Sequence, residues 1–392
     1  MTASRSFDAI VVGAGPAGSV CAYHLARSGA RVALVDREML PRHKTCGGGV
    51  VGRALAHLPI DLEGLCRGES REVELELGDS EIRVRVRSAE PIIRMTLRSE
   101  LDAALADAAR RQGALLREGF RVRGLRRERG WIELAAGVGE GGALRARFAV
   151  AADGAAGATA RLAGFGPAPA ALPALEVTSA SARGDGPARF VMGVPGDGYA
   201  WEFPKRGGAS LGALATRRAG PSGRQALEGA LRRASLEAAE GDPRHGFAIP
   251  AAPRPGGCVR QGVLVAGDAA GLVDPLILEG ISGAAWSGAL AARAVAASLA
   301  RGADAARLYA RGLRPLRREL RVARALAHLL YGHPELRRRA LGRFGPALCE
   351  AMVAVIAGRS TYLELLARAP RTLLRALGSP SPDSSGAPQP AG

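Results

Sequence analysis

A strand–turn–helix–strand pattern near the start of the chain, from Phe7 to Asp36, is typical of proteins that bind dinucleotides. The apolar run F-D-A-I-V-V has the character of a strand buried in a parallel sheet. Three glycines come next in G-x-G-x-x-G spacing: Gly13, Gly15 and Gly18. An apolar helical stretch follows, and then a second apolar run that ends at Asp36. Because all parts of the pattern occur in order, we expect a Rossmann-type unit.

Each residue of this pattern has a physical role in holding a dinucleotide. Gly13 permits the tight turn after the strand, Gly15 lets the backbone approach a pyrophosphate, and Gly18 lets the helix pack closely on the strand. The start of the helix presents free N–H groups to the phosphates. Asp36 is placed to accept a hydrogen bond from a ribose hydroxyl and disfavours a 2′-phosphate, so we expect FAD or NAD rather than NADP.

The chain of 392 residues is long enough for two domains, and its composition, 47% hydrophobic and 23% charged, is that of a globular protein. The first strand begins too close to the N-terminus to leave room for a signal peptide, and no apolar run approaches the roughly 18 residues that span a bilayer. Five scattered cysteines without C-x-x-C spacing predict neither a disulfide framework nor a zinc or other metal site. We expect a cytoplasmic protein.

The net charge of +17 is concentrated near the C-terminus, where residues 301–376 hold sixteen arginines and five carboxylates. Such a region can contact anionic lipid headgroups, bind nucleic acid, or form a solvated basic face. It lacks the interleaved aromatic residues of a single-strand binder. The composition therefore favours peripheral association with the inner membrane face over nucleic-acid binding, with a solvated face as the alternative.

Periodicity predicts further elements along the chain. Residues 72–87 alternate apolar and charged side chains around a Gly-Asp-Ser turn, which predicts a hairpin with one buried face. Other expected elements are a helix at 98–112, hairpins at 120–135 and 199–215, strands at 146–150 and 262–266, and helices at 224–238, 282–300, 303–331, 334–357 and 360–377.

Two stretches are candidates for a ligand site. Three glycines follow Cys46, and without side chains they let a flat or bulky group lie against the backbone; a flexible loop is the alternative. In the run Y-A-W-E-F-P, Tyr199, Trp201 and Phe203 share one face because side chains alternate along a strand. Such an aromatic face is either core or the wall of a binding site.

Together the motifs resemble the geranylgeranyl reductase family, part of the larger group with the p-hydroxybenzoate hydroxylase fold. The similarity covers most of residues 7–310 and, more thinly, the C-terminal helices, where residues 358–362 are similar to a G-x-x-x-Y motif. The larger group shares the glycine turn with Asp36, an Asp153-Gly154 pair and a Gly267-Asp268 pair. Two elements are narrower: K-T-C-G-G-G, like K-x-C-G-G-G, and Y-A-W-E-F-P, like Y-x-W-x-F-P.

The resemblance implies an α/β fold, α+β overall, in which a Rossmann-type FAD domain is interleaved with an antiparallel-sheet substrate domain and followed by C-terminal helices. The expected FAD-binding domain comprises residues 1–70, 91–164 and 258–310. The substrate domain comprises residues 71–90 and 165–257, and a C-terminal helical region spans 311–377. Residues 378–392, rich in Ser, Pro and Gly, are expected to be a disordered tail.

The resemblance also implies the site residues. FAD is expected to contact Gly13, Gly15, Gly18, Asp36, Arg37, Cys46, Gly47, Gly49, Arg98, Val122, Asp153, Asp268, Gly280 and Ile281. Arg98 can reach the pyrophosphate and Asp268 the ribityl hydroxyls, while the N–H groups of Gly280 and Ile281 can face the flavin pyrimidine. The candidate catalytic residues are Cys46, Tyr199 and Trp201, with Cys46 either a proton donor, packed against the flavin ring, or a buried structural cysteine.

Two departures from the family pattern are visible. Gly157 replaces the serine of D-G-x-x-S, so one hydrogen bond in the flavin domain is expected to be missing. Leu276, Ile277 and Leu278 occupy the stretch where the family usually has Thr-Gly, and these bulky apolar residues can reshape the substrate pocket.

The implied reaction is reduction of a carbon–carbon double bond in a prenyl chain, with hydride from flavin N5 and a proton from a protein group or water. No second nucleotide-binding pattern occurs, so we expect NAD(P)H to bind transiently or a partner protein such as reduced ferredoxin to donate electrons. An apolar tunnel between the aromatic strand and the C-terminal helices would hold the substrate. The alternatives are a class A monooxygenase, a flavin-dependent halogenase, and a non-enzymatic electron carrier or lipid-binding flavoprotein.

Overall fold

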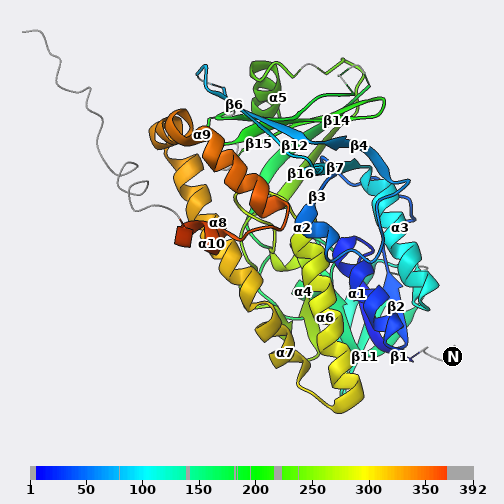
Figure 1. Ribbon diagram of the computed structural model, residues 1–392. Helices are drawn as coiled ribbons and strands as arrows, with labels where there is room; N and C mark the ends of the chain where they lie inside the picture. The colour runs from blue at the N-terminus through cyan, green and yellow to red at the C-terminus, as the bar shows by residue number, and fades with distance from the viewer. Residues whose placement is uncertain are drawn as a thin grey trace, which may run out of the picture.

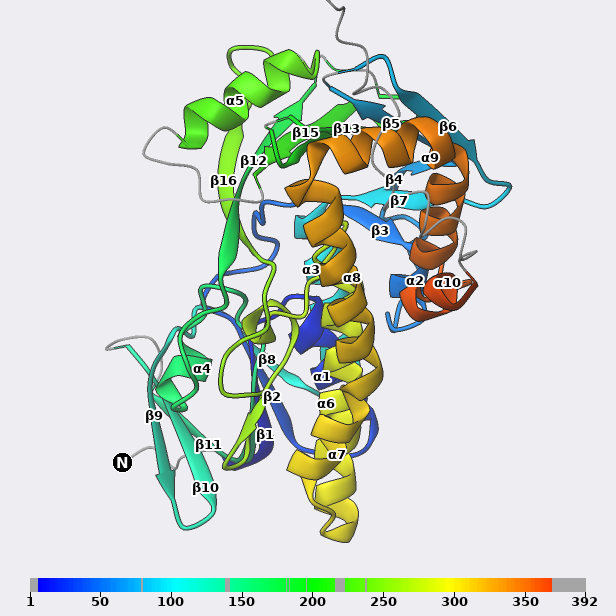
Figure 2. The same ribbon diagram turned by 90° about the vertical axis from the view of Figure 1, so that its left-hand side faces the viewer.

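The structure is a computed structural model, and it describes residues 6–368 except 79, 138–141, 181, 183, 195, 216–222 and 237. The described strands form an eight-stranded, a seven-stranded and a three-stranded sheet. The seven-stranded sheet lies at one end of the molecule and the dinucleotide pattern at the other, and the long C-terminal helices connect the two ends along one side (Figures 1 and 2). The fold is mixed α/β with C-terminal helices, as expected.

The eight-stranded sheet carries the dinucleotide pattern. Its parallel strands run in the order β8-β2-β1-β11-β18, with the antiparallel hairpin of β9 and β10 paired to β11, and β17 paired to β18. The strands are β1 (Ser6–Val12), β2 (Val32–Val35), β8 (Leu115–Arg117), β9 (Val122–Glu128), β10 (Trp131–Ala136), β11 (Ala143–Ala151), β17 (Val259–Arg260) and β18 (Val263–Val265).

Three helices cover one face of this sheet: α1 (Pro16–Arg27), α3 (Arg98–Arg111) and α6 (Ile281–Arg301) (Figure 1). Glycine lets α1 approach its neighbours closely. A Cβ on Gly18 would lie 1.8 Å from the carbonyl oxygen of Gly13, and a Cβ on Gly288 would lie 2.2 Å from the carbonyl oxygen of Ala17. The packing role expected for Gly18 is therefore present, and α6 repeats it from the other side.

The seven-stranded sheet has the order β16-β12-β15-β14-β13-β5-β6, and each pair is antiparallel except β13 with β5. One face packs on α5 (Gly223–Arg233), and the other packs on α8 (Arg314–Gly332) and α9 (Pro334–Ile356) (Figure 2). The strands are β5 (Glu72–Leu77), β6 (Arg83–Arg87), β12 (Ala171–Ser179), β13 (Ala188–Met192), β14 (Tyr199–Lys205), β15 (Gly208–Leu214) and β16 (Arg244–Pro250).

Shorter elements join these layers. The three-stranded sheet, in the order β3-β7-β4, lies between the two larger sheets (Figure 1). The remaining elements are β3 (Gly49–Val51), β4 (Cys66–Ser70), β7 (Ile93–Thr96), α2 (Gly52–Leu55), α4 (Thr159–Leu162), a 3₁₀ turn (Gly267–Ala270), α7 (Ala305–Gly312) and α10 (Tyr362–Arg368).

The C-terminal helices differ from the expectation in one respect. The single helix predicted at 303–331 is two helices, α7 and α8, which meet at Leu313. Pro315 lies at the start of α8, where its missing N–H costs nothing, whereas inside a continuous helix it would remove a hydrogen bond and clash with the preceding turn. Residues 369–377 of the last predicted helix and the predicted tail lie outside the described residues.

The predicted helix at 224–238 is also shorter. It ends at Arg233, and Ser235 follows with a left-handed φ of 53° that cannot continue the helix. Within the described residues, no helix is both long enough and apolar enough to cross a bilayer. The domain boundaries stay a prediction.

Gly288→Ala tests the close contact between α1 and α6. Because the new methyl group would meet backbone, the helices must separate, and we expect a loss of about 1–3 kcal/mol in the free energy of unfolding. Gly229→Ala on α5 is the matched control, since its Cβ would meet only the flexible side chains of Arg233 and Arg232; we expect it to be stabilising by up to about 1 kcal/mol. Denaturant unfolding followed by circular dichroism measures both, and equal midpoints would contradict the account.

Candidate functional site

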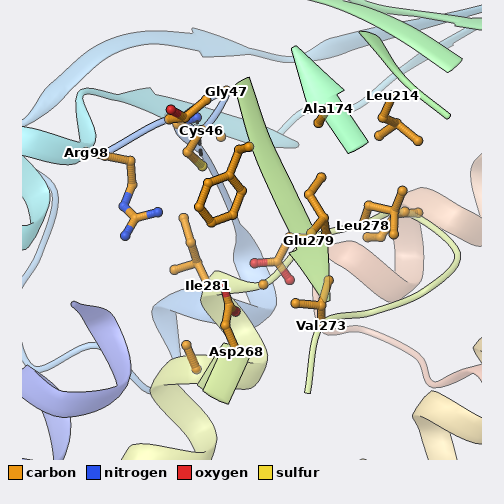
Figure 3. A pocket seen from close by; sticks show the side chains of 18 of the residues that line it. Cys46, Gly47, Arg98, Ala174, Leu214, Asp268, Val273, Leu278, Glu279 and Ile281 are labelled. Carbon is orange, nitrogen blue, oxygen red and sulfur yellow. Dashed lines mark hydrogen bonds between the residues drawn. The ribbon is translucent and has the colours of Figure 1, made fainter. Parts of the chain in front are cut away.

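A cavity of about 1030 Å³ lies between the dinucleotide-type sheet, the aromatic strand β14 and the C-terminal helices. All the predicted site residues except Gly18 line it. They are Gly13, Gly15, Asp36, Arg37, Cys46, Gly47, Gly49, Arg98, Val122, Asp153, Tyr199, Trp201, Asp268, Gly280 and Ile281. Figure 3 labels ten residues of this lining, which come from segments distant in sequence. Gly18 is buried and packs against the carbonyl of Gly13, at the turn, rather than lining the cavity.

The carboxylate of Asp36 fastens the glycine turn to the second strand. One oxygen accepts a hydrogen bond from the N–H of Ala14 at 2.7 Å, and the other accepts one from the N–H of Glu38 at 3.0 Å. Arg42 approaches the first oxygen to 3.6 Å. Asp36 is therefore held rigidly at the cavity wall, at the position from which the sequence predicts a contact with ribose.

Two guanidinium groups are held side by side at the cavity by one buried carboxylate. Asp102, which is fully buried, accepts hydrogen bonds from Arg42 at 3.1 Å and from two nitrogens of Arg98 at 3.0 Å each. Burial lowers the pKa of Arg98, but Asp102 and Cys46 outweigh it and hold the pKa above its ordinary value. A fixed pair of permanent cations suits a pyrophosphate. Sequence reasoning identified Arg98 but missed Arg42.

Lys44 adds a third cation, one whose charge is marginal. Its Nζ lies 3.1 Å from the centroid of the Phe247 ring and 3.3 Å from the carbonyl oxygen of Thr45. Burial and then the nearby Arg98 lower the pKa of Lys44 to about 8, against the partial support of Cys46, Asp268 and Asp102. The K-x-C-G-G-G motif pointed to this residue, but its side chain was not among the predicted site residues.

Hydrogen bonds fix the glycine loop at residues 46–49, against the flexible-loop alternative. The N–H of Cys46 donates to Glu176 at 2.8 Å, and both the N–H and the hydroxyl of Thr96 donate to the carbonyl of Gly48. Gly48 has a φ of 71°, and a Cβ there would lie 2.1 Å from a backbone oxygen. Its conformation and its surroundings both require glycine. Glu176, on β12, had no signal in the sequence.

The replacement of serine by Gly157 is compensated. A Cβ at this position would lie 2.1 Å from the carboxylate carbon of Asp153, so only glycine leaves room for that carboxylate. One oxygen of Asp153 accepts hydrogen bonds from the N–H and the hydroxyl of Thr159, and the other is buried with no partner among the residues that the structure describes. Burial raises the pKa of Asp153. The hydrogen bond that we expected to be missing therefore concerns a single atom, Oδ1 of Asp153, and Asp153 lines the cavity.

Two helices begin at the cavity, α1 after Gly15 and α6 after Gly280. The first N–H groups of a helix have no partner within it, and they favour negative charge nearby. Glu279 accepts from the N–H of Ser282 at 2.7 Å, which satisfies one of these groups in α6. Asp268 lies half-buried in the cavity wall, and desolvation raises its pKa while Lys44 and Arg98 partly lower it again.

The aromatic wall consists of Tyr199, Trp201 and Phe203 on one face of β14, as the period of two predicts (Figure 3 shows the cavity they help to line). Tyr199 is buried, which raises its pKa, and its hydroxyl donates to the carbonyl of Ile277 at 3.0 Å. Trp201 lies over Gly212, where a Cβ would be 1.9 Å from the ring. Within the described part of the chain, its buried indole N–H has no partner.

These features fit FAD. The cavity offers glycine backbone at one helix start, a second helix start, permanent cations beside a buried carboxylate, and an aromatic wall. Two of its buried polar atoms, Oδ1 of Asp153 and Nε1 of Trp201, have no partner among the described residues and are free for a ligand. FAD supplies both the pyrophosphate that the cations favour and a flat polar ring for the wall.

The charge of Lys44 predicts that FAD affinity depends on pH. An anionic cofactor beside Lys44 raises its pKa above 8, so binding takes up a proton and weakens as pH rises through that value. Between pH 7 and 9.5 we expect FAD affinity to fall about tenfold for each unit by which the pKa is raised. Fluorescence titration of FAD-free protein measures this. Lys44→Arg should stay tight, Lys44→Met should be weak and independent of pH, and a flat wild-type profile would exclude this role.

Comparison with known proteins agrees with the geometry. A family model described as an FAD binding domain matches residues 6–220. The chain is 30% identical over 319 residues to the menaquinone reductase of Mycolicibacterium smegmatis, covering 73% of this chain and 75% of that protein. It is 31% identical over 320 residues to digeranylgeranylglycerophospholipid reductase 1 of Methanopyrus kandleri, covering 73% and 79%.

Solved structures show the same fold. A geranylgeranyl bacteriochlorophyll reductase-like protein from Thermoplasma acidophilum superposes with a TM-score of 0.73 over 97% of this chain and 98% of that chain, at 19% identity. The flavin-dependent brominase Bmp2 superposes with a TM-score of 0.71 over 90% and 94%, also at 19% identity. At these identities the structures establish architecture, and the sequence matches establish kinship. The chain therefore belongs to the geranylgeranyl reductase family of FAD-dependent oxidoreductases.

Proposed function

We propose that the protein reduces a carbon–carbon double bond in a prenyl chain, using bound FAD. The observation that supports this best is the apolar end of the cavity. Beyond the charged groups, the cavity continues between the aromatic face of β14 and the C-terminal helices, where aliphatic side chains surround it: Leu276, Ile277, Leu326, Leu330, Leu341 and Met352. Such a chamber favours an apolar chain because binding removes its surface from water.

Bound FAD, once reduced, supplies a hydride at N5. The protein's own part is to exclude water, hold the prenyl chain against the aromatic wall, and deliver a proton. Cys46 is the proposed proton donor, because its thiol sulfur accepts from the N–H of Gly48 at 3.4 Å beside Arg98, in the wall of the cavity. NAD(P)H or a reduced ferredoxin is proposed as the source of electrons.

The names of the relatives support a prenylated lipid as the substrate class, since one is a menaquinone reductase and another a digeranylgeranylglycerophospholipid reductase. The second candidate function is that of a monooxygenase or halogenase. One observation favours it, namely that the brominase superposes over most of both chains. Both reactions start from reduced flavin, but they differ in whether oxygen is needed.

Anaerobic single turnover separates these functions. Chemically reduced protein is mixed with geranylgeranyl diphosphate or a prenylated lipid extract, and flavin absorbance and product mass are followed. We expect flavin reoxidation without oxygen and a product that gains pairs of hydrogen atoms. A flavin that stays reduced until air is admitted, with oxygen or halogen then appearing in the product, would replace this proposal with the second candidate.

Two cysteine variants refine the same experiment. If Cys46 donates the proton, Cys46→Ala should slow reoxidation by substrate about 10²- to 10⁴-fold while FAD stays bound. Cys66→Ala is the matched control, because the thiol of Cys66 donates to the carbonyl of Gly68 outside the cavity. A Cys46→Ala protein as fast as the control would leave Cys46 as a packing residue.

We also propose peripheral association with an anionic membrane. Leu329 of α8 lines the cavity and is 46% exposed, and α10, which packs on α8, exposes Leu363 and Leu366, so exposed leucines occur on two adjoining helices beside the apolar chamber. The exposed arginines of α8 and α9 can meet lipid headgroups while the leucines enter the lipid–water interface.

Vesicle sedimentation tests this association. We expect the protein to sediment with vesicles that contain phosphatidylserine and, at low salt, much less with pure phosphatidylcholine, since the attraction is electrostatic. Replacing both Leu363 and Leu366 by serine should weaken binding about tenfold or more, because two apolar groups no longer leave water. Leu115→Ser, an exposed leucine on β8, should not. Equal sedimentation of all variants would exclude this face.

A further inference from the structure

Leu278 has a backbone conformation that L-residues with a side chain rarely adopt. Its φ is 53°, in the left-handed region. Among the described residues, three other non-glycine residues have positive φ, namely Arg129, Ser235 and Gln261, and all three are exposed. Leu278 alone of the four lines the cavity. Strain of this kind persists only where the surroundings enforce it, and it concentrates at functional sites.

The surroundings of Leu278 do enforce it. The N–H of Leu278 donates to the carbonyl of Asp274 at 2.8 Å, and the N–H of Asp274 donates to the carbonyl of Glu279 at 3.0 Å. These two bonds close the loop at residues 274–279 on itself. The chain therefore turns back sharply just before the start of α6, and Leu278 lies at that turn.

Two tyrosine hydroxyls, from rings that stack with their centroids 6.5 Å apart, hold the same loop. Tyr199 of β14 donates to the carbonyl of Ile277 at 3.0 Å, and Tyr331 of α8 donates to the carbonyl of Leu276 at 2.7 Å. The carboxylate of Asp274 accepts from the N–H of Leu276 at 2.9 Å. The two residues before Leu278 are thus fixed from both walls, so the loop cannot relax to relieve the strain.

The side chain of Leu278 packs in the apolar cluster that separates the aromatic sheet from the C-terminal helices. Ala174 and Leu214 belong to this cluster, and in Figure 3 Leu278 lies toward them, whereas Arg98 and Cys46 lie on the other side of the view. Glu279 and Ile281, which follow within three residues, line the part of the cavity where α6 begins. Leu278 thus occupies the apolar part of the cavity, next to the segment that opens α6.

We infer that Leu278 determines substrate specificity by limiting the width of the apolar chamber, so that it admits a single acyclic prenyl chain and excludes fused-ring groups. This inference rests on the proposed function. A glycine at this position would meet the backbone requirement without strain, yet it would remove an aliphatic side chain from the cavity wall and from the apolar cluster that contains Ala174. The leucine keeps this side chain in the wall despite an unfavourable backbone conformation.

The test compares ligand binding rather than turnover. The FAD-loaded wild-type protein, Leu278→Gly and Gln261→Gly are titrated with geranylgeraniol, an acyclic prenyl alcohol, and with estradiol, a fused-ring steroid, and the flavin spectrum reports binding. Gln261→Gly is the matched control, since it also relieves a left-handed residue but lies at an exposed turn outside the cavity.

We expect Leu278→Gly to gain about tenfold or more in affinity for estradiol, with geranylgeraniol affinity changed less than about threefold, and Gln261→Gly to match the wild type for both. Gln261→Gly should melt close to the wild-type temperature, because relief of strain offsets the greater freedom of glycine in the unfolded chain. Leu278→Gly also relieves strain but loses the packing of its side chain, so its melting temperature serves to show that the variant is folded. Leu278→Ala, which removes most of the side chain but keeps a Cβ and the strain, should also gain estradiol affinity.

Other outcomes overturn the inference or the function separately. A stable Leu278→Gly with wild-type affinities for both ligands would show that the side chain does not limit the chamber. If the wild type bound neither ligand while Leu278→Gly bound both, the role of Leu278 would hold and the prenyl substrate would fail. If no protein bound either ligand, both proposals would fail.

Discussion

The arrangement of the cavity depends on one buried carboxylate, that of Asp274, which is 3% exposed. It accepts hydrogen bonds from Arg53 of α2 and from the hydroxyl of Tyr362 of α10, both at 2.8 Å. Arg53 also donates to Glu279 at 3.2 Å, next to the start of α6. One side chain therefore connects the FAD-binding part of the chain, the loop beside the chamber and the last described helix.

Such a group specifies structure more than it adds stability. Taking a carboxylate and a guanidinium out of water costs about as much as their attraction returns, but removing one partner leaves a buried charge that costs about 3–5 kcal/mol. Burial lowers the pKa of Arg53, but Asp274 and Glu279 outweigh burial and hold the pKa above its ordinary value. The ion pair therefore stays charged. Alternative positions of α10 would take the Tyr362 hydroxyl away from Asp274 and leave that carboxylate oxygen with Arg53 alone. This explains why a short helix far along the chain carries the tyrosine of a G-x-x-x-Y motif.

The parts of the site that could be predicted from sequence are those built from local backbone geometry. The turn at Gly13, the close packing at Gly18 and the shared face of Tyr199 and Trp201 each follow from spacing over a few residues. The partners of Cys46 and Asp153 could not be predicted in this way. Glu176 lies 130 residues from Cys46, on a strand whose alternation only indicates a sheet.

The prediction of one helix at residues 303–331 was wrong because hydrophobic periodicity does not register where a helix must end. The apolar periodicity of residues 303–331 continues through Leu313, so a single helix was expected, and the stop came from Pro315, whose effect is independent of periodicity. Thr159 shows the converse, because it restores hydrogen bonds that the change to Gly157 seemed to remove. Neither effect could be inferred from hydrophobic pattern alone.

FAD binding and substrate choice are determined by different kinds of residue in this fold. The cofactor end uses backbone groups and paired charges. Only glycine fits the backbone at positions 13 and 48, and Asp102 binds two arginines. The apolar end uses aliphatic side chains, which can change size without unpairing any polar group. Substitutions at positions 276–278 are therefore compatible with an intact cofactor site. The leucine at 278 violates the local backbone preference in a loop that the hydroxyls of Tyr199 and Tyr331 hold in place, and natural chains break local rules mainly where function requires it.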